Sequence, residues 1–571
     1  MSAPPTDRQR LLTVAIAALI VLATFAAYTP ALHGEFIWDD NQYIRDNPEL
    51  RALPGLWDIW LSPRATPQYH PLVFTTFWIE YHLWGADTLG YHLINVALHV
   101  ATALLLWRLL VELGLPGGAL AAAIFALHPV HLESVAWIAE RKNTLSGVFC
   151  LATILAWLRF LAQREWRHCW LALGCFACTL LSKSILSPLP VALLLLTWWK
   201  RPADWRRAGI ALLPFFILSL AMSAVGWWRE QLYHNPPLPL SLAERVLIAN
   251  RAVWFYVGKL LWPVSLTPIY PRWEMHVSVW SASLLLLTLA VLAGLWAAHR
   301  RLSRGPLVAA GYFVIMLGPV LGIIDFNYSQ YSFVADHFQY AASAGLIAVL
   351  GTTAAVAVQR ARGSGRAVAS AVIGVLLLVL AVLSWRSAVH YATAEAFWRD
   401  TLAKNPQAWK AESNLAATLA TQGQFDEAIA HYQAALAIRP DFPEAHNHWG
   451  IVLARQGKAD EALAQFDAAL QINPEQADAH NNAGAVLAQQ QKWAAAAQRF
   501  AAAVRINPAY IEAYDSWGIV TLKQGRPDEA IEHFEAALRI NPNYGPAQQH
   551  LAATRRLLDG SANTPPPGSY P

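Results

Sequence analysis

The chain has 571 residues, of which 56% are apolar and 14% are charged, and its formal net charge at pH 7 is only +4. A nucleic-acid-binding protein would need a larger basic excess, whereas a composition this apolar is typical of a membrane protein. Apolar runs of membrane length recur as far as Trp385 and are absent afterwards. We therefore expect a membrane domain followed by a soluble tail, and since all four cysteines fall in the apolar runs, disulfides do not stabilise that tail.

The first apolar run, residues 11–28, is long enough to cross a bilayer, which takes about 20 residues as a helix. Arg8 and Arg10 precede it, so the positive-inside rule places its N-terminal end in the cytoplasm. The run is longer than a signal-peptide core, and Tyr28-Thr29-Pro30 offers no small-residue cleavage site. We interpret it as a retained first span.

Apolar length and the distribution of Lys and Arg together predict about eleven spans. They cover residues 11–29, 91–112, 118–136, 143–162, 168–182, 185–199, 208–228, 279–298, 306–324, 338–357 and 367–385. Two charged stretches, 70–85 and 242–262, are interpreted as interfacial or re-entrant helices on the exoplasmic side. An odd number of spans puts the C-terminal tail on that side as well.

A repeat with a period of 34 residues begins at Asn405 and indicates a tetratricopeptide array. Its marks are a proline after each repeat boundary and an aromatic residue at one fixed phase: Pro406, Pro440, Pro474, Pro508, Pro542, Tyr432, Phe466, Phe500 and Phe534. The predicted fold is thus all-α, a polytopic helix bundle followed by an α-solenoid. The predicted divisions are a membrane domain (1–390), a linker helix (391–404), the repeats (405–559) and a disordered, Pro-rich tail (560–571).

One phase of the repeat carries side chains that can form hydrogen bonds, namely Asn414, His448, Asn482 and Ser516. Amide groups both donate and accept, so such a ladder could hold the backbone of an extended peptide with little regard to its sequence. A solvated concave face without a ligand is the equally weighted alternative.

The loop after the first span holds adjacent carboxylates in Phe36-Ile37-Trp38-Asp39-Asp40, where they suit a catalytic pair. Further polar strings follow in order: Tyr69-His70-Pro71-Leu72, Tyr91-His92-Leu93-Ile94-Asn95, His128-Pro129-Val130-His131, Glu133, Arg141, Ser182-Lys183, Ala335-Asp336-His337 and Tyr340. This series resembles the transmembrane and tetratricopeptide-repeat O-mannosyltransferases of the C-type glycosyltransferase superfamily. Two positions depart from the family pattern, because His70 replaces an arginine and Asp336-His337 replaces Glu-Arg.

The resemblance implies a polyprenyl-phosphate sugar donor and assigns roles to the matched residues. Asp39 is the expected general base toward an acceptor hydroxyl, while Asp40 orients the acceptor or binds a cation; the reverse assignment, or a helix-capping pair, stays open. Glu133 completes the acidic site or is an ordinary helix-end carboxylate.

Lys183 is expected to neutralise the departing phosphate, with Arg141, Arg251 and His337 as further candidates; snorkelling is the alternative for each of these three. His128 and His131 are interpreted as structural, since two histidines alone make a poor metal site. The metal therefore stays unknown, with a divalent cation as an option.

The leading hypothesis is an inverting membrane glycosyltransferase that moves a sugar, mannose by the resemblance, to Ser/Thr hydroxyls of exported proteins on the exoplasmic side. No Gly-rich phosphate loop is present to cradle a nucleotide, which suits a lipid-carried donor. The alternatives are a noncatalytic membrane scaffold for envelope proteins and a transferase acting on glycolipid or polysaccharide. The alanine-rich composition and compact loops are typical of bacteria and favour the bacterial cytoplasmic membrane, whereas an endoplasmic-reticulum location would use the same topology.

Overall fold

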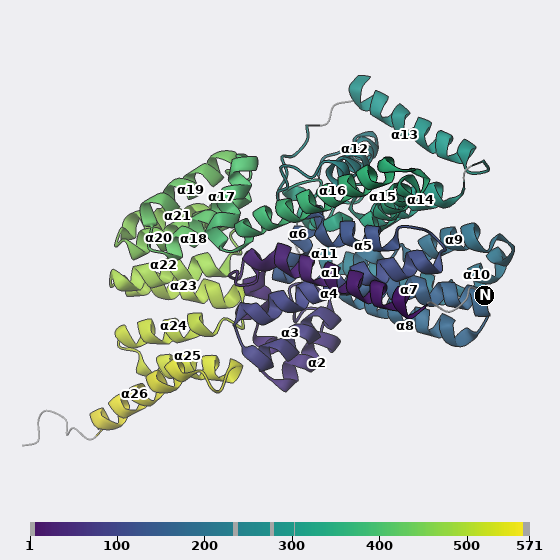
Figure 1. Ribbon diagram of the computed structural model, residues 1–571. Coiled ribbons are helices and arrows are strands. Elements are labelled where there is room, and N and C mark those ends of the chain that lie inside the picture. The colour runs from purple at the N-terminus through teal and green to yellow at the C-terminus, as the bar shows by residue number, and fades with distance from the viewer. Residues whose placement is uncertain (1–5, 232–237, 275–278, 302, 563–571) are drawn as a thin grey trace, which may run out of the picture. The chain divides into compact units, whose positions relative to one another are not determined.

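The computed structural model describes residues 6–231, 238–274, 279–301 and 303–562, and all regular elements within these ranges are helices (Figure 1). The predicted all-helical class is therefore confirmed. The chain divides into two compact units, Met1–Pro406 and Gln407–Pro571. Helix α26 (Gly545–Ala562) runs into the predicted disordered tail, and the rest of that tail, residues 563–571, lies outside the described residues.

Among its described residues the first unit contains seventeen α-helices, which are joined by turns, by 3-10 segments and by one π-helical segment, Asn41–Arg45. They are α1 (Asp7–Tyr28), α2 (Leu53–Leu61), α3 (Pro71–Trp84), α4 (Thr88–Glu112), α5 (Gly118–Leu127), α6 (Leu132–Ala136), α7 (Arg141–Gln163), α8 (Trp166–Ser182), α9 (Leu189–Lys200), α10 (Trp205–Ala211), α11 (Leu213–Gln231), α12 (Leu242–Leu261), α13 (Val279–Ala298), α14 (Gly305–Leu317), α15 (Tyr340–Arg360), α16 (Ser364–Ala388) and α17 (Ala394–Lys404).

Six helical stretches among the described residues are long and apolar enough to cross a membrane: Asp7–Ala31, Thr88–Glu112, Ile138–Gln163, Ser281–Ala298, Asp336–Arg360 and Ser364–Tyr391. Two more of the eleven predicted spans, 118–136 and 208–228, form helix pairs bent by 56° and 52°, which would bring the number to eight. Those predicted at 185–199 and 306–324 are shorter apolar helices, and the one predicted at 168–182 corresponds to α8, which is not among the candidate spans. Proline explains the short ones, because α9 starts beside Pro188 and α14 ends at Gly318-Pro319.

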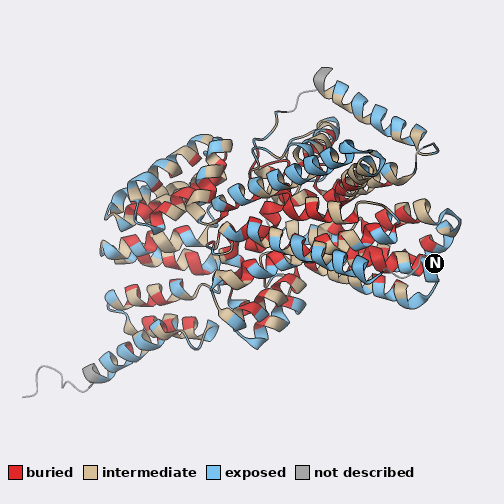
Figure 2. Cartoon of the chain, viewed as in Figure 1, coloured by how far each residue is buried: buried red, intermediate tan, exposed pale blue. Residues whose placement is uncertain are grey.

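Several of the candidate spans expose apolar side chains that a soluble protein would bury. Helix α13 is the extreme case, since none of its best apolar window is buried, and Leu286 is 65% exposed. Figure 2 shows the same pale-blue exposure along α13 and α16. Continuous exposed apolar surface of this kind favours contact with lipid. The predicted interfacial helix at 242–262 corresponds to α12, which is not among the candidate spans.

The second unit consists of antiparallel helix pairs: α18 (Trp409–Thr421), α19 (Phe425–Ile438), α20 (Pro443–Arg455), α21 (Ala459–Ile472), α22 (Ala477–Gln489), α23 (Trp493–Ile506), α24 (Ile511–Lys523) and α25 (Pro527–Ile540), closed by α26. The two helices of a pair approach closely because small residues face aromatic rings. A Cβ added at Gly450, Gly484 or Gly518 would come within 2.6, 2.9 or 2.5 Å of the phenylalanine ring opposite. Each such ring is fully buried, which stabilises the stack by about 1.5–3 kcal/mol per residue.

Helix α17 lies where the sequence predicts a linker helix, and it packs within the first unit. The Lys404 ammonium donates to the Leu266 carbonyl at 2.8 Å, and the Asn405 amide donates to the Ile269 carbonyl at 3.1 Å. Phe397 and Trp398 are buried on its inner face. The last helix before the repeats is therefore fastened to the membrane-type unit.

Candidate functional site

The loop that carries the acidic pair is fixed through Asp40. Its carboxylate is fully buried, one oxygen accepting the Ile37 backbone N–H at 3.0 Å and the other the Ala139 backbone N–H at 2.6 Å. Burial raises the pKa of Asp40 well above its ordinary value, although both hydrogen bonds oppose that shift. Asp40 thus ties its loop to the segment before α7, and half-buried Asp39 is the carboxylate of the pair that a ligand can reach.

Both oxygens of Asp40 accept a backbone N–H, which gives this carboxylate a structural role, and its cation role stays a prediction. Within the described ranges, no three side chains from His, Cys, Asp and Glu come together as metal ligands would. The metal therefore remains unassigned.

Trp38 adopts a left-handed backbone conformation, with φ of 47°, directly before the acidic pair. Such a conformation costs about 1–3 kcal/mol for a residue with a bulky side chain and persists only where its surroundings fix it. The indole stacks on Trp137 with ring centroids 5.0 Å apart and meets Trp398 edge-on at 5.2 Å. Aromatic packing therefore holds the backbone from which Asp39 projects.

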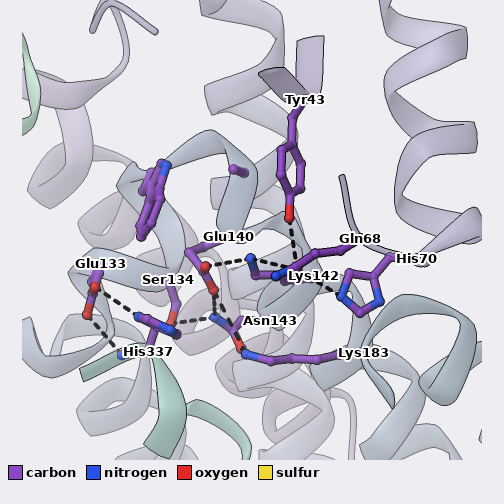
Figure 3. A network of polar contacts seen from close by, with 12 residues as sticks. Tyr43, Gln68, His70, Glu133, Ser134, Glu140, Lys142, Asn143, Lys183 and His337 are labelled. Carbon is purple, nitrogen blue, oxygen red and sulfur yellow. Dashed lines mark hydrogen bonds and ion pairs between the residues drawn. The ribbon is translucent and has the colours of Figure 1, made fainter. Parts of the chain in front are cut away.

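Glu133 and His337 meet although more than two hundred residues separate them. Glu133 stands on α6 and His337 on a 3-10 segment, Asp336–Gln339, before α15. One carboxylate oxygen lies 2.9 Å from His337 Nδ1, and the other accepts the His337 backbone N–H at 3.0 Å. Both side chains are buried, as Figure 3 shows at the left of the network. The structure thus brings together a predicted acidic site residue and a predicted phosphate ligand.

Beside this pair, Glu140 is shared by two lysines. Lys142 Nζ lies 2.9 Å from one oxygen of Glu140, and Lys183 Nζ lies 3.9 Å from the other. Asn143 bridges the group, because its amide donates to Glu140 and to Ser134 while its carbonyl oxygen accepts from Lys183. Figure 3 shows Glu140 between the His337 side and the Lys142 side. We call Glu133, Glu140, Lys142, Asn143, Lys183 and His337 the charged cluster.

Lys183 has N–H donors that no hydrogen bond to the described residues uses. Its side chain is 9% exposed, and Asn143 takes one of its three N–H donors. Burial lowers the pKa of Lys183 to about 8, and Lys142 adds to this while Glu140 opposes it. The ammonium form therefore predominates at neutral pH. An anion entering the cluster would stabilise that charged form.

A polar chain extends the charged cluster toward the loop before α3. The Gln68 side-chain oxygen accepts from the Tyr43 hydroxyl at 2.8 Å and from Lys142 at 3.5 Å, and it lies 3.2 Å from His70 Nε2. Burial and the charges of both lysines lower the pKa of His70 to about 3. At this departure from the family pattern the chain therefore presents a neutral imidazole instead of a cation.

Asp39 lies close enough to Lys142 for their charges to interact, and Glu133 and Glu140 interact in the same way with Lys183. The acidic loop and the charged cluster therefore form one site. Of the residues expected there, the structure brings Asp39, Asp40, Glu133, Lys183 and His337 together.

Two predicted phosphate ligands have other contacts. Arg141 is fully buried and ion-paired with Glu80, and it also donates to Asn95, to Thr76 and to the Tyr91 carbonyl. Arg251, on α12, lies over the Trp273 ring at 4.4 Å. Arg141 therefore joins α3, α4 and α7, and within the described ranges neither arginine side chain forms a hydrogen bond or ion pair with the charged cluster.

Four residues of the site were not singled out by the sequence reasoning: Gln68, Glu140, Lys142 and Asn143. The signal was present in Ala139-Glu140-Arg141-Lys142-Asn143, where three consecutive charges stand at the start of a membrane-length apolar run. Ionisable residues within such runs generally have a partner and a function.

In the repeat unit, Asn414, His448, Asn482 and Ser516 lie on α18, α20, α22 and α24. Asn482 donates to Asn447 of the preceding repeat at 3.0 Å, and Asn414 Nδ2 has no hydrogen-bond partner among the described residues. His448 is exposed, and its ring centroid lies 6.4 Å from that of Tyr432. These positions offer polar groups one repeat apart, as the ladder hypothesis requires.

Models of the families described as TPR repeat and Tetratricopeptide repeat match residues 418–457, 452–491 and 511–544. The protein O-mannosyl-transferase F38B6.6 of Caenorhabditis elegans is 29% identical over 33% of this chain and 29% of its own length. Protein O-mannosyl-transferase Tmtc3 of Drosophila melanogaster is 23% identical over 72% of this chain and 54% of its own length. Protein O-mannosyl-transferase TMTC4 of Mus musculus is 24% identical over 73% of this chain and 65% of its own length.

The chain thus combines apolar helices suited to a membrane with a tetratricopeptide array. It is a homologue of proteins named protein O-mannosyl-transferases, which confirms the resemblance predicted from the sequence. Its matches span less than two thirds of each of these three relatives.

Proposed function

We propose that this chain is a membrane glycosyltransferase that moves mannose from a polyprenyl phosphate to Ser or Thr hydroxyls of exported proteins on the exoplasmic side. The observation that carries this proposal is Lys183, a buried ammonium with unused donors, in the same site as the accessible carboxylate Asp39. The names of the homologues support the sugar and the protein acceptor.

In the proposed reaction the acceptor hydroxyl oxygen attacks the anomeric carbon of the sugar, and the bond from that carbon to the phosphate oxygen breaks. Asp39 takes the hydroxyl proton as general base. Polyprenyl phosphate leaves with the electron pair, and Lys183 and Lys142 stabilise its added negative charge. Direct displacement inverts the anomeric centre.

Glu133 and Glu140 have positioning roles in this scheme. Glu133 accepts both the ring N–H and the backbone N–H of His337, so it fixes the imidazole beside the site. Glu140 holds Lys142 and, through Asn143, Lys183. Glu140 thereby keeps the two ammonium groups in place, and Glu133 the imidazole, before the donor arrives.

The tetratricopeptide unit would present the acceptor. Its regular spacing of 34 residues places polar groups on the first helix of each successive repeat, and such a row suits an extended peptide chain. Binding by a linked module raises the local concentration of acceptor without new contacts at the reacting atoms. Removing residues 407–571 should therefore weaken acceptor use and spare donor binding.

The test compares intact masses of exported glycoproteins from cells that carry the wild-type chain or Asp39→Asn at equal membrane levels. Loss of a general base should slow transfer by about 10²–10⁴-fold, so hexose-sized masses should disappear. Asp58→Asn, an exposed carboxylate on α2, is the matched control and should leave the masses unchanged.

Unchanged masses in Asp39→Asn would contradict the proposal and favour a noncatalytic scaffold. Loss of hexose from glycolipid alone, with protein masses unchanged, would replace the acceptor class.

A further inference from the structure

A cavity separate from the charged cluster lies within the first unit. It encloses about 480 Å³, within the range of about 300–1,000 Å³ of ligand pockets. Helices α4, α7, α9, α14 and α15 form its walls, which are mainly aliphatic; Leu106, Leu110, Ile154, Leu196, Val308 and Val349 are representative. Such walls suit a hydrocarbon chain.

On α4 and α7 the cavity lies farther along the helix than the charged cluster, and on α15 its lining runs from Ala344, seven residues after His337, to Val356. On α4, Asn95 bonds to Arg141 at the cluster end, whereas the cavity begins at Leu106 and continues to Leu113. On α7 the cluster holds the first turn and the cavity takes Leu151 and Ile154. Figure 1 shows α9 and α10 at the end of this unit that also holds the N-terminus. By the positive-inside rule this is the cytoplasmic end.

Two cations stand beside lining residues of the cavity. Lys200 Nζ donates at 2.6 Å to the carbonyl of Leu113, which lines the cavity. Arg304 stands between two lining residues, Ser303 and Gly305. Its guanidinium donates at 2.7 Å to the Trp198 carbonyl. Both side chains are partly exposed. Neither forms an ion pair with a carboxylate within the described ranges, so their charges are available to an anion.

One lining group also lacks a partner. The hydroxyl of Thr352, on α15, is buried and has no hydrogen-bond partner within the described part of the chain. A bound molecule with an ester oxygen would satisfy it.

We infer that this cavity binds a phospholipid with an anionic headgroup from the cytoplasmic leaflet, its acyl chain lying between α4, α9, α14 and α15 and its phosphate on Lys200 and Arg304. Anionic lipids are the anions concentrated at that membrane face, and basic pockets between membrane helices bind them. A polyprenyl phosphate offers the same chemistry, but the proposed transfer site needs its phosphate at the other end of the unit. The phospholipid is therefore the occupant that the location favours.

The experiment uses the full-length protein purified in nanodiscs and transferred to native mass spectrometry with equimolar phosphatidylglycerol and phosphatidylcholine. Wild-type protein should retain phosphatidylglycerol selectively. The double variant Lys200→Gln/Arg304→Gln should weaken that retention by about 30-fold, because each cation near a membrane surface strengthens the binding of an anionic lipid about fivefold. The double variant Arg206→Gln/Arg207→Gln removes the same charge from exposed positions on α10 and should retain the lipid.

A second variant tests the chain-binding part. Ala348→Phe places a ring in the cavity and should abolish retention of phosphatidylglycerol, whereas Ala357→Phe, at an exposed position of α15 outside the lining, should not. Equal retention of both lipids by wild type would overturn the inference, as would retention that Ala348→Phe leaves unchanged. Displacement of phosphatidylglycerol by equimolar polyprenyl phosphate would assign the cavity to the carrier instead. None of these readouts depends on transferase activity.

Discussion

Arg141 and Lys183 are both buried cations near a carboxylate, yet their surroundings differ. Arg141 is fully buried and makes four hydrogen bonds, to Glu80, Asn95, Thr76 and the Tyr91 carbonyl. Lys183 is 9% exposed, bonds Asn143 and lies 3.9 Å from Glu140. A cation whose donors are used by the protein holds helices together, whereas one with unused donors is ready for a ligand. Under the proposed function, the comparison separates a structural charge, Arg141, from one that binds the donor, Lys183.

The largest expected effect comes from removing the carboxylate that pairs with the structural cation, Arg141. Glu80→Gln leaves the Arg141 charge buried without its carboxylate, which should lower the free energy of unfolding by about 3–5 kcal/mol. The measurement is thermal or denaturant unfolding of the purified protein in detergent. A variant as stable as wild type would show that the pair does not hold α3 and α7 together.

Trp38 tests how rigidly the acidic loop is held. Trp38→Ala removes the stack on Trp137 and keeps a Cβ in the left-handed region, so the loop should relax and Asp39 should lose its position. Trp38→Gly tolerates that backbone, and its kcat should exceed that of Trp38→Ala by about fivefold or more. Equal kcat in the two variants, with equal folding by circular dichroism, would contradict a role through the backbone.

The pH dependence of transfer tests the role proposed for Lys183. The pKa of Lys183 is lowered to about 8, so the ammonium form dominates below that pH and is lost above it. Transfer should therefore fall by about fivefold between pH 8 and pH 9, because the neutral amine cannot stabilise the leaving phosphate. Lys183→Arg keeps the charge at all these pH values and should move the alkaline limb upward. If activity in Lys183→Arg falls at the same pH as in wild type, the alkaline limb belongs to the titration of another group.

The smallest expected effect concerns the repeats. Asn482→Ala removes the bond to Asn447 and one amide of the ladder, and should raise the acceptor KM by about two- to tenfold, as expected for one hydrogen bond. The donor KM should not change. Gln489→Ala, an exposed amide on the same helix, is the control. An unchanged acceptor KM in Asn482→Ala would favour the solvated-face interpretation.

The repeats were the most predictable part of the fold, because a period of 34 residues fixes both helices of each pair and the aromatic ring between them. The number of spans was harder to predict, since apolar length alone does not show where prolines shorten α9 and α14 or where α5 and α6 bend. Hydropathy finds apolar segments but not their breaks.

The site was only partly predictable for a related reason. Ordered polar strings led to Asp39, Glu133, Lys183 and His337, which the structure brings together. The same reasoning chose Arg141 and passed over Lys142 one residue later. Successive helical residues point about 100° apart, so only the packing of α7 decides which of the two faces Glu80 and which faces Glu140.

The most direct test of the account measures the affinity of polyprenyl phosphate for the purified protein by titration. Lys183→Gln should weaken binding by about 10²-fold or more, while Arg45→Gln, which removes an exposed cation from the first loop, should match wild type. That result would place the leaving phosphate on the charged cluster. Equal affinities in wild type and a folded Lys183→Gln protein would contradict the central claim that the unused donors of Lys183 bind the donor phosphate.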